Sequence, residues 1–110
     1  MWISRQVLRE YIAVITREQT FMKPMSSATV IERINYFQSH FNIAEDNALV
    51  TENLLKLLET VAVGGKQIHD ANIVATMQSY SIAHLLTVNV SDFTRFASLI
   101  NVRSLDEITE

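Results

Sequence analysis

The sequence contains no cysteine, and only one proline and two glycines among its 110 residues. Without cysteine the chain has neither disulfides nor thiolate metal sites, which fits a cytoplasmic protein. Because proline and glycine are so scarce, long irregular loops are not expected and helices should dominate.

Long apolar runs and an excess of basic residues are also lacking. No run approaches the roughly 20 residues that span a membrane, and no signal peptide is visible, so we expect no membrane partner. The formal net charge is −3, whereas proteins that hold nucleic acid through its phosphates usually present a basic surface. A nucleic-acid partner would therefore require another source of positive charge, such as a bound divalent cation.

The residues that are present indicate a packed protein. Hydrophobic residues make up 48% of the chain and charged residues 19%, which is typical of globular domains. The length fits one domain with one core, and no internal repeat or linker interrupts it.

Hydrophobic spacing predicts four helices, over about 4–17, 27–40, 47–61 and 69–80. Their expected N-caps are Ser4 for the first, Ser26 or Ser27 for the second, and Asp46 for the third. Apolar runs predict parallel strands at 85–89 and 101–104, and shorter strands at 1–3 and 41–45. This order of helices and strands indicates an α/β fold with a parallel sheet.

Asp70 stands in "GKQIHDANIVATM" (65–77), directly before an apolar helix. In the first helical turn an acid is favoured by about 0.3–1 kcal/mol, and this structural role alone would explain it. However, Asp70 shares a helix face with Ile73, Val74 and Met77, and a carboxylate facing a core is costly unless it is paired or binds a metal. The spacing by itself favours the structural role.

Three other polar residues are candidates for a site. Glu10 borders the buried side of the first helix, although by itself it reads as a surface residue or an ion-pair partner of Arg5 or Arg17. Asn89 ends the predicted strand 85–89 and Asp92 follows it, and polar residues at and past the carboxyl ends of parallel strands line functional crevices. For Asp92 a turn or a helix cap is the structural alternative.

The remaining signals are weak. His40, His69 and His84 have no ligand spacing, so a zinc site is not expected. The run Gly64-Gly65-Lys66 lacks the rest of a phosphate-binding loop.

The segment "GGKQIHDANIVATM" followed by "HLLTVNVSDFTRF" resembles the second half of PIN domains, the family of VapC-like toxin ribonucleases. The segment "WISRQVLREYIAVITR" resembles the part of that family in which a helix carries an acid, here Glu10. The resemblance implies that 1–110 is a single PIN-like domain. Its fold would be a three-layer α/β fold, with a short parallel sheet of order 3-2-1-4-5 flanked by helices.

The resemblance also implies a mechanism. Clustered carboxylates hold Mg²⁺ or Mn²⁺, which activates water for attack on an RNA phosphodiester. By this resemblance Glu10, Asp70 and Asp92 are the catalytic and metal-binding positions, and Asn89 is a polar neighbour in the same pocket. The expected activity is that of an endoribonuclease toxin of a toxin–antitoxin system.

The chain departs from the family at its beginning. PIN domains open with a strand ending in an aspartate and then a helix, whereas Met1 falls where the second strand is already under way. The missing first strand is the central one; a late start codon, a deliberate truncation and a decayed gene all remain open. We therefore expect an impaired ribonuclease. The alternative is a non-catalytic remnant that forms a homodimer or binds an antitoxin protein.

Overall fold

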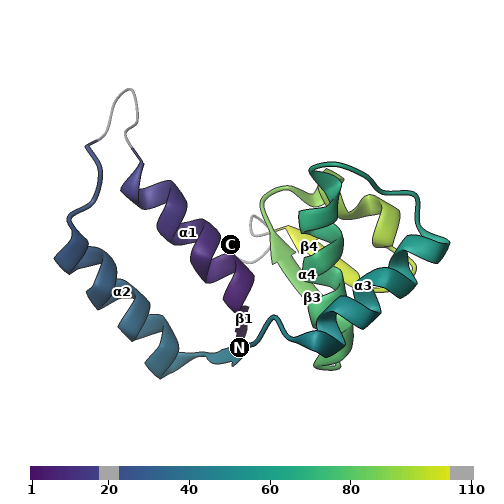
Figure 1. Ribbon diagram of the computed structural model, residues 1–110, viewed down its shortest axis with the longest axis horizontal. Coiled ribbons are helices and arrows are strands. Elements are labelled where there is room, and N and C mark those ends of the chain that lie inside the picture. Colours follow the sequence, from purple (N-terminus) through teal and green to yellow (C-terminus); the bar gives the residue numbers. More distant parts are fainter. Residues whose placement is uncertain (18–22, 105–110) are drawn as a thin grey trace. The chain divides into compact units, whose positions relative to one another are not determined.

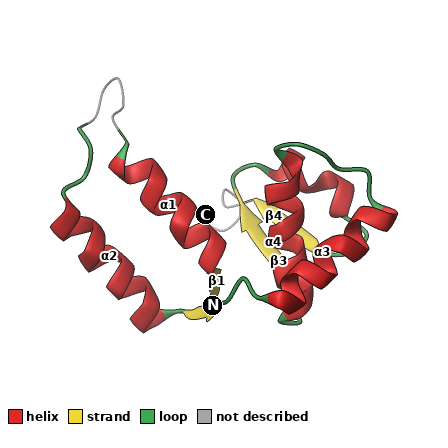
Figure 2. Ribbon diagram, in the orientation of Figure 1, coloured by secondary structure: helices red, strands yellow, loops and turns green. Residues whose placement is uncertain are grey.

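The computed structural model describes residues 1–17 and 23–104. The chain divides into two compact units, Met1–Asp46 (the first unit) and Asn47–Glu110 (the second unit). Each combines helices with a two-stranded parallel sheet, which confirms the α/β class (Figure 1, Figure 2). The single PIN-like domain stays a prediction. Within the described ranges, no helix has the length and apolar character that crossing a membrane requires.

The first unit has the element order β1 (Trp2–Ser4), α1 (Arg5–Thr16), α2 (Ser27–His40) and β2 (Asn42–Ala44). Strands β1 and β2 are parallel, with Ile3 opposite Ile43. The predicted caps are confirmed at both helices. The Ser4 hydroxyl accepts a hydrogen bond from the Val7 amide (3.0 Å), and the Ser26 hydroxyl accepts one from the Thr29 amide (3.3 Å).

Arg5 ties the beginning of α1 to the ends of α2 and β2. Its Nε donates to Glu45 Oε1 at 2.8 Å, and its Nη1 donates to Gln38 Oε1 at 2.7 Å. The hydrogen bond from the Arg5 guanidinium lowers the pKa of Glu45, and the same bond raises the pKa of Arg5. Between the two helices, Tyr11 and Phe37 meet edge to face with ring centroids 5.7 Å apart.

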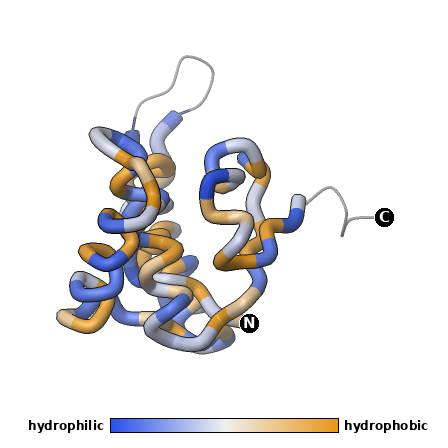
Figure 3. Tube along the Cα trace, turned by 90° about the vertical axis from the view of Figure 1, so that its right-hand side faces the viewer, coloured by the Kyte–Doolittle hydropathy of each residue, from blue (hydrophilic) through white to orange (hydrophobic). Residues whose placement is uncertain are grey.

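The second unit comprises α3 (Ala48–Thr60), α4 (Gln67–Ser79), β3 (His84–Thr87), the 3₁₀ helix η1 (Val90–Phe96) and β4 (Asn101–Ser104). Strands β3 and β4 are parallel. The predicted helices and strands are thus confirmed, and none of their ends differs by more than two residues from the end expected. Hydrophobic and hydrophilic residues are interspersed along the chain trace (Figure 3).

One core holds the second unit together. Helices α3 and α4, the helix η1 and the residue before β4 all contribute buried side chains to it: Val50, Leu57, Ala71, Val74, Ala75, Met77, Phe93, Phe96 and Ile100. From the strands, Leu85 and Val102 pack against this cluster, so one face of the β3–β4 sheet is covered by the core.

The N-cap predicted for α3 is wrong by one residue. Asn47, not Asp46, caps the helix, because its Oδ1 accepts a hydrogen bond from the Val50 amide at 3.2 Å. Asp46 instead forms an ion pair with Arg9, with 3.6 Å between Oδ2 and Nη2.

The helix that carries Asp70 begins earlier than predicted, at Gln67 and not near His69. Gly65 has φ 57°, a left-handed conformation that glycine adopts readily. The turn continues directly into α4, since the Gln67 amide donates to the Gly64 carbonyl and the Ile68 amide to the Gly65 carbonyl, both at 3.1 Å.

Candidate functional site

Asp70 lies in the first turn of α4, at the edge of the core. Its side chain is half-buried, while the next residue, Ala71, and Val74 on the same side of the helix are fully buried. Lys66 occupies the N-cap position of α4 and makes no side-chain capping hydrogen bond. Because Asp70 lies in the first turn of α4, the helix macrodipole favours its negative charge there.

Asn89 and Asp92 follow the carboxyl end of β3, as the sequence predicts. The Asn89 amide donates to the Thr87 hydroxyl at 3.0 Å, and the Asp92 amide donates to the Asn89 carbonyl at 3.1 Å. These bonds shape the turn into η1. Both side chains are exposed, but the neighbouring Phe93 is only 5% exposed and anchors Asp92 to the core.

Asp70 and Asp92 lie at the same end of the second unit. Strand β3 follows α4 after a short turn in which the Ile82 amide donates to the Met77 carbonyl at 2.8 Å, so β3 runs back along α4 (Figure 1). The beginning of α4 and the carboxyl end of β3 are therefore at one end. Phe93 of η1 and Ala71 of α4 share the same core cluster, which agrees with this placement.

Glu10 belongs to the first unit. It lies on α1 with an exposed side chain, and its Oε1 accepts a hydrogen bond from Nε2 of the buried Gln6 at 3.3 Å. Glu10 is thus an exposed residue of α1 that is hydrogen-bonded to the buried Gln6.

Two cations accompany the acids of the second unit. Lys66 directly precedes α4, and Arg95 follows Asp92 by three residues on η1. Residues three apart on a 3₁₀ helix lie on the same side. Arg95 Nη1 donates to the carbonyl of Ala62 at 3.3 Å, which links η1 to the segment leading into α4. The same end therefore offers carboxylates together with positive side chains that suit a phosphate.

The oxygen donors at this end are of the kind that Mg²⁺ and Mn²⁺ prefer. Mg²⁺ is commonly bound through one or two protein carboxylates, substrate phosphates and water, and Asp70 and Asp92 fit that requirement. Over residues 1–17 and 23–104, no group of three or more histidine, aspartate and glutamate side chains could hold a metal ion. Asp70 and Asp92 are the two ligands that the sequence analysis suggests for this end of the second unit, and a metal site there stays a prediction.

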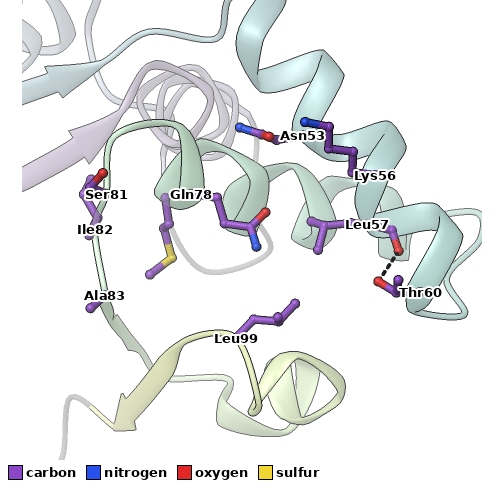
Figure 4. Close-up of a pocket in the computed structure, with 10 residues that line it drawn as sticks. Asn53, Lys56, Leu57, Thr60, Gln78, Ser81, Ile82, Ala83 and Leu99 are labelled. Atoms are coloured by element: carbon purple, nitrogen blue, oxygen red, sulfur yellow. Dashed lines mark hydrogen bonds between the residues drawn. The ribbon is translucent and has the colours of Figure 1, made fainter.

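A groove of about 600 Å³ lies at the opposite end of α4 (Figure 4). Helix α4 has 13 residues, so its two ends are about 20 Å apart. The groove is lined by Met77, Ile82 and Leu99, with Lys56 at its side and Ser81 at the turn. Ser81 has φ 55°, a backbone conformation that is uncommon for residues other than glycine. Among the described residues no carboxylate lines this groove, and it lies at the end of α4 away from Asp70.

Comparisons of the chain with protein-family models, with curated proteins and with solved structures find no match.

Sequence reasoning did not identify Arg95 or the groove. Arg95 lies within "NVSDFTRF", three residues past Asp92, and that spacing was the available signal. The groove gathers residues from α3, α4, the turn before β3 and the segment before β4, and no single stretch of sequence indicates it.

Proposed function

We propose that the chain is a PIN-like endoribonuclease that depends on Mg²⁺ or Mn²⁺. The observation that carries the proposal is the position of Asp70, at the beginning of α4, at the same end of the second unit as Asn89 and Asp92 past β3. Parallel α/β sheets usually place polar functional groups past the carboxyl ends of their strands, which is where Asn89 and Asp92 lie.

The strand pairing supports the PIN-like part of the proposal. In the order 3-2-1-4-5, strands 3 and 2 are neighbours on one side of the central strand, and strands 4 and 5 on the other. By the resemblance, β1 to β4 of this chain correspond to strands 2 to 5 of that order. The pairs β1–β2 and β3–β4 are both parallel, as the neighbours 2–3 and 4–5 of that order require.

In this function Asp70 and Asp92 hold the cation. When bound, the metal lowers the pKa of a water molecule and offsets the charge of an RNA phosphate. Asn89 orients the phosphate or the water by hydrogen bonding, and Lys66 and Arg95 offset the negative charge of the RNA.

The test is cleavage of single-stranded RNA at micromolar protein, with Mn²⁺ and with EDTA. We expect cleavage that needs the metal and that falls at least about tenfold in Asp70→Asn. Glu52→Gln is the matched control, because it also removes one exposed carboxylate from the second unit but lies on α3. Cleavage that survives Asp70→Asn, or no cleavage by the unaltered chain, would contradict the catalytic proposal.

A second candidate function is that of an interaction module that associates with itself or binds an antitoxin-like protein. Large apolar side chains on the described surface favour it, among them Val88 (69% exposed), Ile31 (61%) and Leu55 (57%). Exposed apolar groups of this kind often mark contacts with other chains when they gather in one patch.

A further inference from the structure

The connection between the two units consists of residues 45–47. Strand β2 ends at Ala44 and α3 begins at Ala48. The division between the units falls inside this connection, directly after Asp46. Asn47, the next residue, is held by the second unit's own helix, because its side chain caps α3. The contacts of the two residues before it therefore decide how firmly the connection is held to the first unit.

Two arginines of α1 hold those two residues. Arg5 donates to the Glu45 carboxylate from both Nε and Nη2, and charge-assisted bonds of this forked kind are among the stronger ones in proteins. Its Nη1 donates to Gln38 of α2, which fixes the direction of the guanidinium group. Arg9 lies one turn further along α1, on the same face, and its Nη2 is 3.6 Å from Asp46 Oδ2. Consecutive turns of one helix thus hold consecutive carboxylates of the connection.

The four charges act together. The Arg5 hydrogen bond lowers the pKa of Glu45, and the positive charges of Arg5 and Arg9 lower it further. Arg9 therefore acts on both carboxylates, through its ion pair with Asp46 and through its charge on Glu45. A single ion pair at a protein surface contributes little, whereas forked geometry and a network of several charges contribute more.

We propose that Arg5 and Arg9 form a clamp on residues 45–46, and that the two units change their relative orientation when this clamp opens. Between the Asp46 side chain, held to the first unit, and the Asn47 side chain, held to the second, lies a single peptide bond. With the clamp closed, the connection can turn only through the main-chain torsions next to that bond. With the clamp open, the torsions of residues 45–46 can change as well.

The first experiment measures backbone order parameters of the full chain by NMR relaxation. The amides of residues 45–46 should have values of about 0.85, as in rigid backbone, and these should fall below about 0.6 in Arg5→Gln/Arg9→Gln. Arg17→Gln/Arg33→Gln is the matched control. It also removes two arginines from the first unit, one at the end of α1 and one on α2, and should leave the values unchanged.

Residual dipolar couplings measure the consequence for the two units. One alignment tensor should fit both units in the unaltered chain and in the control, whereas Arg5→Gln/Arg9→Gln should require two. A charge exchange keeps the proposal testable if that variant fails to fold. Asp46→Arg alone brings like charges together and should open the clamp, and adding Arg9→Asp should restore the order parameters of the unaltered chain.

Low order parameters at residues 45–46 of the unaltered chain would overturn the clamp. So would high values that persist both in Arg5→Gln/Arg9→Gln and in Asp46→Arg. Two alignment tensors in the unaltered chain would overturn the effect of the clamp on the units.

Discussion

Phe96 is the side chain on which the placement of Asp92 depends most. It is fully buried, and its ring lies 6.4 Å from that of Phe93, centroid to centroid. Together the two rings hold η1 against the core of the second unit. Phe96→Ala should cost about 3–5 kcal/mol, because it removes a whole ring from a packed site and leaves a cavity. A compact unit of this size is stabilised by only about 3–9 kcal/mol, so most of its stability should be lost.

Urea unfolding followed by circular dichroism measures this effect. Phe96→Leu, which retains most of the volume, should cost only about 1–1.5 kcal/mol. Leu99→Ala is a control in the segment that follows η1, and because Leu99 is 43% exposed its loss should cost less than about 1 kcal/mol. If Phe96→Ala cost no more than Leu99→Ala, η1 would not be packed as described, and the position argued for Asp92 would be wrong.

Two further predictions concern the first unit and the junction. Asn47→Ala should destabilise α3 by about 1 kcal/mol through loss of its cap, whereas Asp46→Ala should cost less; thermal unfolding of both variants compares them, and the reverse order would restore Asp46 as the cap. Because the Arg5 hydrogen bond lowers the pKa of Glu45, its contribution is present at neutral pH and is lost as the pH falls through and below the ordinary glutamate value of about 4.3. Glu45→Gln should therefore lose stability at pH 7 but little at pH 3, as measured by urea midpoints; an equal loss at both values would contradict the ion pair.

The parts of the fold that the sequence predicted correctly depend on local relations. Ser4 and Ser26 bond to amides three residues ahead, and the sequence shows that relation directly. At α3 two neighbouring residues can both cap. The choice of Asn47 coincides with an ion pair between Asp46 and Arg9, which are far apart in sequence. Sequence spacing cannot choose between two neighbouring residues that could both cap a helix when a residue far away in sequence decides which one does.

In the candidate site too, features that depend on neighbouring residues could be predicted, and features that depend on distant partners could not. The position of Asp92 past a strand could be predicted, since the apolar run before it ends in a polar turn. Arg95 could not be linked to the segment before α4, because its bond to Ala62 spans 33 residues of sequence. The half-buried state of Asp70 follows from its helix face, but the earlier beginning of α4 depends on the turn at Gly65, which spacing alone did not resolve.

The most direct test of the central claim is a titration of the chain with Mn²⁺ followed by NMR. A bound paramagnetic ion broadens the amide signals nearest to it. If Asp70 is a metal-site carboxylate, low Mn²⁺ should selectively broaden signals around Asp70 and Asp92, and Asp70→Asn should abolish the effect while Glu52→Gln preserves it. If Asp70 only stabilises the beginning of α4, Asp70→Asn would lower stability by about 0.3–1 kcal/mol and leave the Mn²⁺ response unchanged. That second result, or no selective broadening at all, would contradict the account.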